Sequence, residues 1–372
     1  MNNELKINPK LLKWAREECG YSKLEIADKI HVDQEQYSAW EDTGTGLSLN
    51  ALITLSKVCK RQIAFFFLPN IPPKTKKPTD FRNLEPTLAK LTYNTLLAIR
   101  RTVRFQDFLL QLHGPEYYEN KYSWLSEYQN AFRALPVDSD DSTSWIRNLL
   151  GYPVHEQLAD KIDSETSYSR WRTSIEHNLG IHIFQFAMSK FEVQGFSYSD
   201  SLPYCITINN LYPATSRTFS LFHELSHILK SQSGLCKPDD TVIRRQETSV
   251  EYDCNSFAGS LLVPSKEVIP ANDKDTIFKY ASKFKISSEV YLRRLFALDY
   301  VSETEFFHLL DEIHKSVLPT KPHYSKSQVN RSINSRGRAL FDSTLDAMNQ
   351  GRISHSLASG ILGLKINYLF GF

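Results

Sequence analysis

The pattern of apolar and polar positions predicts four short helices within residues 1–68. Each has apolar residues on one side and is bounded by a residue that begins or ends helices, namely Gly20, Ser22, Asp33, Gly44 and Ser48. The sides that we expect to be buried are Leu11, Leu12, Trp14 and Ala15; Leu24, Ile26, Ala27 and Ile30; Tyr37 and Trp40; and Leu49, Leu52, Ile53, Leu55 and Val58. Short helices with a tight break between the second and the third are typical of a helix-turn-helix bundle.

The clearest domain boundary follows this bundle. The stretch PNIPPKTKKP contains four prolines, three lysines and almost no apolar side chains. Such a composition is typical of a semi-rigid linker. We therefore expect a helix-turn-helix domain at 1–68 and a linker at 69–79.

The rest of the chain predicts a second, mainly helical domain with a small sheet. Helical spacing continues to about residue 178, and GIHIFQF and YCITIN then read as strands, with an edge strand and turn in VQGFSYSDSLP between them. The stretch FSLFHELSHILK reads as a helix, and a further helix over about 247–262 ends at Pro264. The chain is therefore α+β and mostly helical, with a domain at 80–312 and a helical C-terminal extension at 313–372.

Composition and charge narrow the possible partners and the compartment. The net charge of the 372 residues is only +2, so any nucleic-acid contact must come from a local patch. The N-terminus, MNNELKINPK, lacks the apolar region of a signal peptide, and no apolar stretch near it is long enough to span a membrane. The five cysteines form no C-x-x-C pair, which is typical of reduced thiols. We expect a cytoplasmic protein with no membrane contact.

The main candidate for chemistry is His223-Glu224-x-x-His227 in a predicted helix. Residues four apart on a helix lie on one face, so the two imidazoles can hold one ion. Zinc with three protein ligands keeps a fourth position for water and lowers the pKa of that water to about 7. Glu224, one position on, can then act as the general base. We therefore predict one Zn²⁺ per chain.

The third ligand is expected on the next helix. Glu251 begins a stretch of helical spacing, and Asn255 lies four residues later, where its side chain can fix the tautomer of a ligating imidazole. Glu247 and Asp253 are the competing ligands, although Asp253 points away from Glu251 on that helix. A bare H-E-x-x-H occurs by chance in many helices, but the downstream E-x-x-x-N pattern favours a metal site.

Other residues near the motif have weaker support. Cys236 could approach the ion, but an ordinary loop cysteine is the better interpretation. Arg217 and Tyr252 are possible oxyanion-stabilising groups, although spacing supports neither.

FSLFHELSHIL followed by VEYDCNSFAGSLLVP resembles the ImmA/IrrE family of bacterial metallopeptidases, over roughly residues 180–300. The family pattern is H-E-L-G-H and then E-x-x-A-N-x-F-A-x-x-L-L-x-P; Ser226 and Cys254 depart from it, and both are small. The resemblance implies a zincin-like fold, with His223, His227 and Glu251 as ligands and Glu224 as the base. It also implies cleavage of one specific repressor or partner protein. The alternative is a non-catalytic antitoxin or regulator of a toxin–antitoxin module, which binds a toxin and its own promoter.

The N-terminal bundle resembles the Xre/Cro repressor-like domain, with DQEQYSAWEDTG as the recognition helix. Gln34, Gln36 and Ser38 are then placed to reach base edges or phosphates. This helix carries four acidic residues and no basic one, so alone it would repel DNA. Nearby basic residues can compensate, and a homodimer would double them: Lys23, Lys29, Lys57, Lys60 and Arg61. A protein-binding module is the other interpretation of the domain.

The C-terminal extension begins with a basic run without acidic residues, which consists of Lys315, Lys321, Lys326, Arg331, Arg336 and Arg338. Such a run is usually a solvated connector, although it can also contact nucleic acid or an acidic partner. The apolar stretch that ends the chain must be buried, and we expect it to pack within its own chain.

Overall fold

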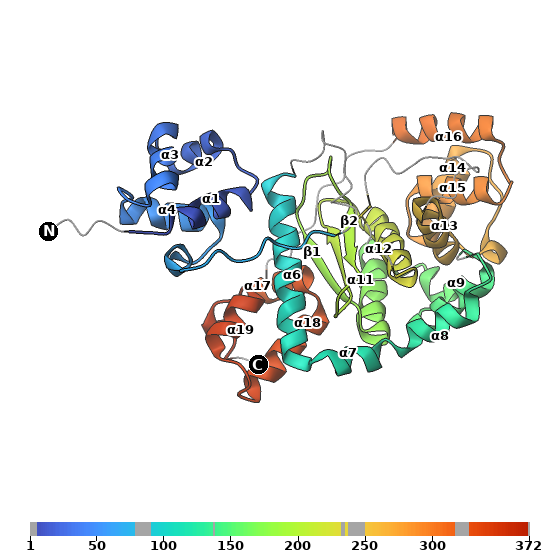
Figure 1. The fold of residues 1–372 in the computed structure, drawn as a ribbon. Coiled ribbons are helices and arrows are strands. Elements are labelled where there is room, and N and C mark those ends of the chain that lie inside the picture. Colours follow the sequence, from blue (N-terminus) through green and yellow to red (C-terminus); the bar gives the residue numbers. More distant parts are fainter. Residues whose placement is uncertain are drawn as a thin grey trace. The chain divides into compact units, whose positions relative to one another are not determined.

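The computed structural model describes residues 6–78, 91–136, 138–231, 235–236, 250–316 and 327–370 (Figure 1). The chain divides into two compact units. The first contains the described residues up to Lys77 and the beginning of helix α6 (Tyr93–His113) as far as Val103. The second extends from Arg104 to the C-terminus. Among the described residues, no helix combines the length and the apolar character needed to cross a bilayer.

The first unit contains the predicted helices. They are α1 (Pro9–Glu17), α2 (Lys23–Ile30), α3 (Gln34–Thr43) and α4 (Leu49–Cys59), followed by the 3₁₀ turn η1 (Ile63–Phe67). Ser22 and Ser48 cap α2 and α4 with their side chains, as predicted. Asp33 precedes α3 but makes no side-chain cap hydrogen bond. The core includes Trp14, Ile26, Tyr37, Trp40 and Leu52, so the apolar pattern locates most of the buried positions.

Two predicted core positions are wrong. Leu24 and Leu49 lie in the first turns of α2 and α4 and are 54% and 55% exposed. Leu24 precedes Ile26 by two positions, and residues two apart do not share a helix face. The buried side of α2 is instead Ile26, Ala27 and Ile30.

Gly44 ends α3 because the backbone there adopts φ +70°, which favours glycine. A Cβ atom at this position would lie 2.3 Å from the carbonyl oxygen of Ile7. The close approach allows the Ile7 N–H to donate to the Gly44 carbonyl at 3.1 Å. The end of the recognition helix is thereby tied to the segment that precedes α1.

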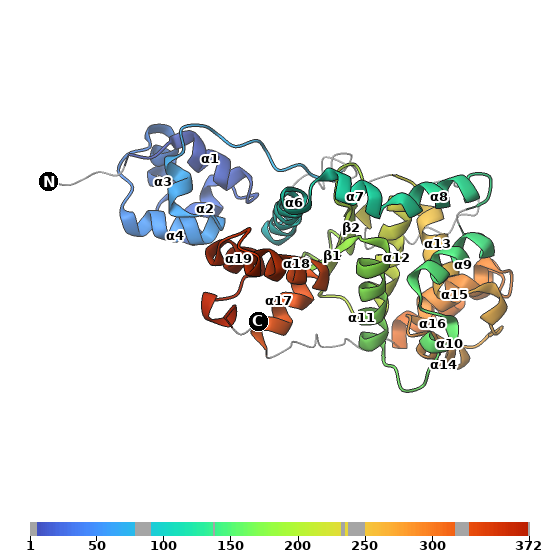
Figure 2. The ribbon, with the colours of Figure 1, turned by 90° about the horizontal axis from the view of Figure 1, so that it is seen from below.

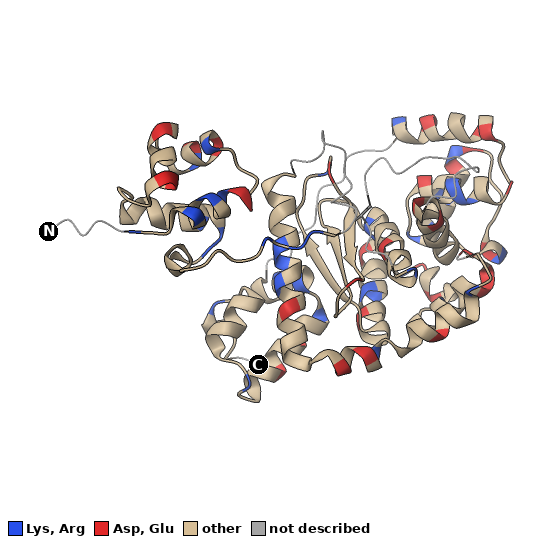
Figure 3. Ribbon diagram, in the orientation of Figure 1, with Lys and Arg blue, Asp and Glu red and all other residues tan. Residues whose placement is uncertain are grey.

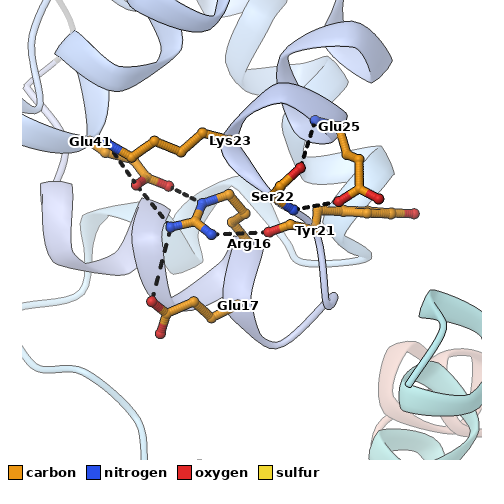
Figure 4. A network of polar contacts seen from close by, with 7 residues as sticks. All are labelled: Arg16, Glu17, Tyr21, Ser22, Lys23, Glu25 and Glu41. Atoms are coloured by element: carbon orange, nitrogen blue, oxygen red, sulfur yellow. Dashed lines mark hydrogen bonds and ion pairs between the residues drawn. The ribbon is translucent and has the colours of Figure 1, made fainter. Parts of the chain in front are cut away.

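A buried ion pair ties α3 to α1 (Figure 4). The Arg16 guanidinium donates to both carboxylate oxygens of Glu41, at 2.7 and 3.2 Å, and also to the Tyr21 carbonyl at 3.0 Å. The Glu41 side chain is only 3% exposed. Glu41 therefore faces the interior, although it belongs to the acidic recognition helix, and its charge is neutralised within the domain.

The second unit begins with helices that precede a sheet. They are the end of α6, then α7 (Pro115–Lys121), α8 (Ser123–Phe132), α9 (Asp140–Leu150), α10 (Val154–Gln157), α11 (Ser164–Ser174) and the π-helical turn η3 (Ile175–Leu179). This predominance of helices before the sheet agrees with the sequence pattern.

The sheet has the order β1-β3-β2-β4. Its strands are β1 (His182–Phe186), β2 (Gly195–Tyr198), β3 (Cys205–Asn209) and β4 (Leu235–Cys236). β1 pairs parallel to β3, whereas β2 pairs antiparallel to both β3 and β4. The predicted edge strand, β2, is therefore an inner strand over Gly195 and Phe196, because the two-residue β4 covers its outer side. Sequence patterns do not reveal so short a partner.

Helices after the sheet complete the unit. They are α12 (Ala214–Leu229), α13 (Val250–Leu262), the 3₁₀ turn η4 (Ser265–Glu267), α14 (Lys274–Phe284), α15 (Ser288–Ala297) and α16 (Glu303–Ser316). α12 packs on β2, β3, α11 and α13. The fold is α+β and mostly helical, as predicted.

The C-terminal extension forms α17 (Gln328–Arg336), α18 (Arg338–Asn349), α19 (His355–Leu362) and the turn η5 (Ile366–Tyr368). α17 lies beside β1 (Figure 2). Phe341, Met348, Leu362 and Leu369 form a common core, so part of the last apolar stretch packs within its own chain, as expected, whereas Ile366 and Phe370 are 43% and 71% exposed. The predicted helix break near Leu318–Pro322 and the basic residues Lys321 and Lys326 lie outside the described residues.

The Arg16–Glu41 pair generates the first prediction. Glu41→Gln leaves a largely buried guanidinium without its carboxylate, which costs about 3 kcal/mol when the pair is buried. We expect faster amide hydrogen exchange in α1 and α3 of the full-length protein. Glu35→Gln is the control, because Glu35 is exposed on the same helix. Equal exchange rates in the two variants would mean that the ion pair does not stabilise the domain.

Candidate metal centre and recognition helix

The helix α12 carries the H-E-x-x-H motif and is buried on nearly every side. Of residues 218–229 only Phe219 is partly exposed. His223 and His227 are therefore polar groups inside an apolar core, where an imidazole without a partner is costly. Their Nε2 atoms face each other at 3.1 Å.

The carboxylate of Glu251 reaches the same point from α13. One of its oxygens lies 3.2 Å from His223 Nε2 and the other lies 3.5 Å from His227 Nε2. The imidazoles are 0% and 1% exposed, whereas the Glu251 side chain is 33% exposed. The site thus lies deep in the fold and opens to solvent on the side of Glu251.

The three ligand atoms fit a single zinc-like ion. Two ligand atoms at about 2.0–2.1 Å from a tetrahedral ion lie about 3.3 Å apart. The two imidazole nitrogens, 3.1 Å apart, lie close to that separation, and each lies near a different oxygen of the Glu251 carboxylate, at 3.2 and 3.5 Å. One ligand atom from each of the three residues lies within 4.8 Å of the other two. Two imidazole nitrogens and one carboxylate oxygen are also a donor set that zinc accepts. The group can therefore bind a metal ion.

Asn255 orients one of the imidazoles. Its side-chain oxygen lies 2.8 Å from His223 Nδ1. An amide oxygen only accepts hydrogen bonds, so the proton is on Nδ1 and the lone pair of Nε2 faces the centre. Asp253 points elsewhere on α13 and forms an ion pair with Lys230. Glu247, the other competing ligand, lies outside the described residues, as does the side chain of Cys236.

At the candidate centre, the Glu251 carboxylate and the His227 imidazole each stabilise the charged form of the other. Burial alone would raise the pKa of Glu251, but its contacts with the imidazoles of His223 and His227 lower it to about 2. Burial alone would lower the pKa of His227, but its contacts with Cys254 and Glu251 raise it to about 11. The carboxylate is consequently ionised, which is the form that ligates a cation, whereas a cation that binds His227 must displace the proton of its imidazolium.

Glu224 lies beside the ligands on α12 but faces the sheet. It is completely buried, and burial raises its pKa, although the two histidines and a hydrogen bond with Ser197 oppose that shift. Gly195 on β2 lies opposite Glu224, since a Cβ there would lie 3.4 Å from Cγ of Glu224. Spacing within the motif could not identify Ser197 or Gly195, because both belong to β2.

Arg217 and Tyr252, the two possible oxyanion-stabilising residues, lie on α12 and α13. The Arg217 guanidinium donates to the Tyr212 carbonyl, to Gln185 and to Glu165. It lies six positions before His223, toward the opposite end of α12. Tyr252 is 36% exposed on α13, one position after Glu251.

Two parts of the chain match models of known protein families. Residues 176–296 match the family model of the IrrE N-terminal-like domain, a peptidase family, and residues 12–66 match a helix-turn-helix model. The chain combines these two domains. This is the architecture that the motifs predicted. No curated protein matches the chain, and no solved structure does.

In the helix-turn-helix domain, the predicted DNA-reading residues lie on the surface of α3. Gln34 and Gln36 are exposed and Ser38 is partly exposed. α3 has acidic but no basic positions (Figure 3). Lys57 is exposed near the end of α4. Unlike Lys57, Arg61 packs against the domain: its guanidinium carbon lies 4.7 Å from the centre of the Trp14 ring, and burial lowers its pKa.

The candidate metal centre gives the second prediction. We expect about one zinc ion per purified chain and no bound zinc in His223→Ala, as measured by elemental analysis. Asn255→Ala should keep the fold and lower zinc affinity about 10–100-fold, because His223 loses the group that orients it. Asp253→Asn is the control on the same helix. Stoichiometric zinc in a His223→Ala, His227→Ala double variant would contradict the assignment.

Proposed function

We propose that this protein is a zinc-dependent regulatory peptidase that cleaves a specific repressor or partner protein, and that its helix-turn-helix domain binds DNA. The observation that carries the proposal is the convergence of His223, His227 and Glu251 from two helices, with the unligated carboxyl of Glu224 beside them. The match to a peptidase family over the same residues supports it.

Each side chain has a distinct role in the proposed hydrolysis. His223, His227 and Glu251 would hold the ion, which supplies a Lewis acid that polarises the scissile carbonyl and activates water. Glu224 would accept the proton of the attacking water and deliver it to the leaving amine. Its buried position favours this role, because burial raises the pKa of the carboxyl toward the range of a general acid and base.

The fusion of the two domains supports a regulatory substrate. A DNA-binding domain would hold the peptidase near proteins bound to the same DNA, and a repressor is such a protein. Linkage in one chain raises the effective concentration of one domain near the partner of the other. This favours one specific substrate over general protein digestion.

Glu224→Gln tests the enzymatic proposal. The variant should retain zinc, since Glu224 is not a ligand, and it should lose proteolysis by a factor of 100 or more, as is typical when a general base is removed, on the order of 10²–10⁴. Glu267→Gln is the control, because Glu267 is exposed outside the centre. The readout is cleavage of the cellular substrate together with zinc content. A cellular effect that persists in Glu224→Gln would show that the protein acts by binding, as an antitoxin would.

We further propose that Gln34 and Gln36 read base edges, with Ser38 assisting, and that Lys57 contacts a phosphate. Glu41 is already neutralised by Arg16, so the exposed face of α3 is less acidic than its sequence suggests. Arg61 stacks on Trp14, and we therefore assign it to packing rather than to phosphate contact. A homodimer at its own promoter would double these contacts.

DNA binding should be weak and only moderately dependent on salt. With about four neutralised phosphates, the log–log slope of affinity against salt should lie near −4. Lys57→Gln should weaken binding to all sequences alike, whereas Gln34→Ala should cost about 1–3 kcal/mol at its preferred base only. Gel-shift titrations with the full-length protein at two salt concentrations measure both effects. If the upstream DNA does not shift even at low salt, the domain is a protein-interaction module.

A further inference from the structure

A large cavity with several charged residues in its wall lies at the end of α12 that is remote from the candidate metal ligands. It has a volume of about 1120 Å³ and is lined by α11, the end of β1, the start of α12 and α17. Its wall contains two glutamates, Glu165 and Glu176, and five arginines, which are Arg172, Arg217, Arg331, Arg336 and Arg338. The wall is therefore positively charged, and the volume is that of a small-molecule site.

Two of these arginines are held in place by the protein. Arg172, only 7% exposed, donates to the carbonyl oxygens of Asn334 and Ile183 at 2.7 and 2.6 Å. The carbonyls orient its guanidinium without neutralising it, and the nearest carboxylate, Glu176, is 3.8 Å away. The two oxygens of Glu176 accept the backbone N–H groups of Ile183 and Arg338 at 3.3 and 3.0 Å, and burial raises the pKa of this carboxyl.

Arg217 is oriented from three directions. It donates to the Tyr212 carbonyl, to Gln185 Oε1 and to Glu165 Oε1, at 3.0, 2.8 and 2.5 Å. The Glu165 side chain is 54% exposed, so a ligand anion can replace it at little cost. The Gln185 side chain also donates to the Asn334 carbonyl at 2.9 Å. One hydrogen-bond network thus joins α11, β1, α12 and α17 around the cavity.

The remaining wall offers further donors. The Tyr168 side chain is buried beneath Arg217, whose guanidinium carbon is 4.4 Å from the centre of the Tyr168 ring. α12 begins at the cavity without a side-chain cap, so its first N–H groups are available to an anion. Arg331, on α17, is exposed and free to close over a ligand.

We propose that this cavity is a second ligand site, which binds a small phosphorylated molecule through Arg172, Arg217 and Arg331. Guanidinium groups recognise phosphate oxygens bidentately, and three of them from three helices match a ligand with more than one negative charge. The site adds a ligand-binding function to the chain and does not depend on the proposed peptidase activity.

Calorimetric titration of the full-length protein with inorganic phosphate and with pyrophosphate tests the site. Pyrophosphate should bind saturably, one per chain, and more tightly than phosphate because it carries more charge. Arg331→Gln and Arg217→Gln should each weaken pyrophosphate binding about tenfold or more, since a charged hydrogen bond is lost. Arg170→Gln is the control: this arginine is also on α11, but it pairs with Glu156 and does not line the cavity.

The same titration in His223→Ala separates this site from the metal centre, because pyrophosphate also binds zinc. Binding that persists in His223→Ala and in Arg170→Gln, and that weakens in Arg331→Gln and Arg217→Gln, supports the proposal. Circular dichroism checks that the Arg217 variant is folded. The proposal is overturned by the absence of saturable binding at millimolar pyrophosphate, by loss of binding in His223→Ala, or by wild-type affinity in a folded Arg331→Gln or Arg217→Gln protein.

Discussion

The burial of α12 is the constraint on which the rest of the second unit depends. A helix packed between a sheet and other helices would normally be apolar, yet α12 carries His223, Glu224 and His227 in its interior. Each of these groups needs a partner, because an unpaired polar group in the core is costly. The partners come from elsewhere in the fold: Asn255 and Glu251 from α13 and Ser197 from β2. The arrangement of α13 and β2 around α12 therefore creates the candidate metal centre.

The local parts of this arrangement could be predicted from sequence, and the long-range parts could not. A helical repeat places His223 and His227 on one face, and the E-x-x-x-N spacing places Glu251 and Asn255 on another single face, so each pair follows from local geometry. Ser197 and Gly195 depend on how β2 packs against α12, which no spacing within either element contains. The inner position of β2 depends on the two-residue β4, which is too short to produce a pattern.

The charges of the first unit also divide into those that follow from the local sequence and those that depend on long-range contacts. Counting charges along α3 describes an acidic helix, but the fold turns Glu41 inward onto Arg16 and stacks Arg61 on Trp14. One anionic group and one cationic group are thus removed from the surface that faces a partner. The charges of the helix can be counted from the sequence. The charge of its exposed face depends on tertiary contacts, which only the structure shows.

The central claim is that two imidazoles and one carboxylate, and no sulfur, hold the ion. Cys254 is a specific alternative ligand, since it lies on α13 close enough to His227 to raise the pKa of that imidazole. X-ray absorption at the zinc edge of the purified full-length protein distinguishes these possibilities directly. The account predicts only nitrogen and oxygen neighbours at about 2.0–2.2 Å. A sulfur neighbour at about 2.3 Å, or a protein purified without metal that takes up none when zinc is added, would contradict it.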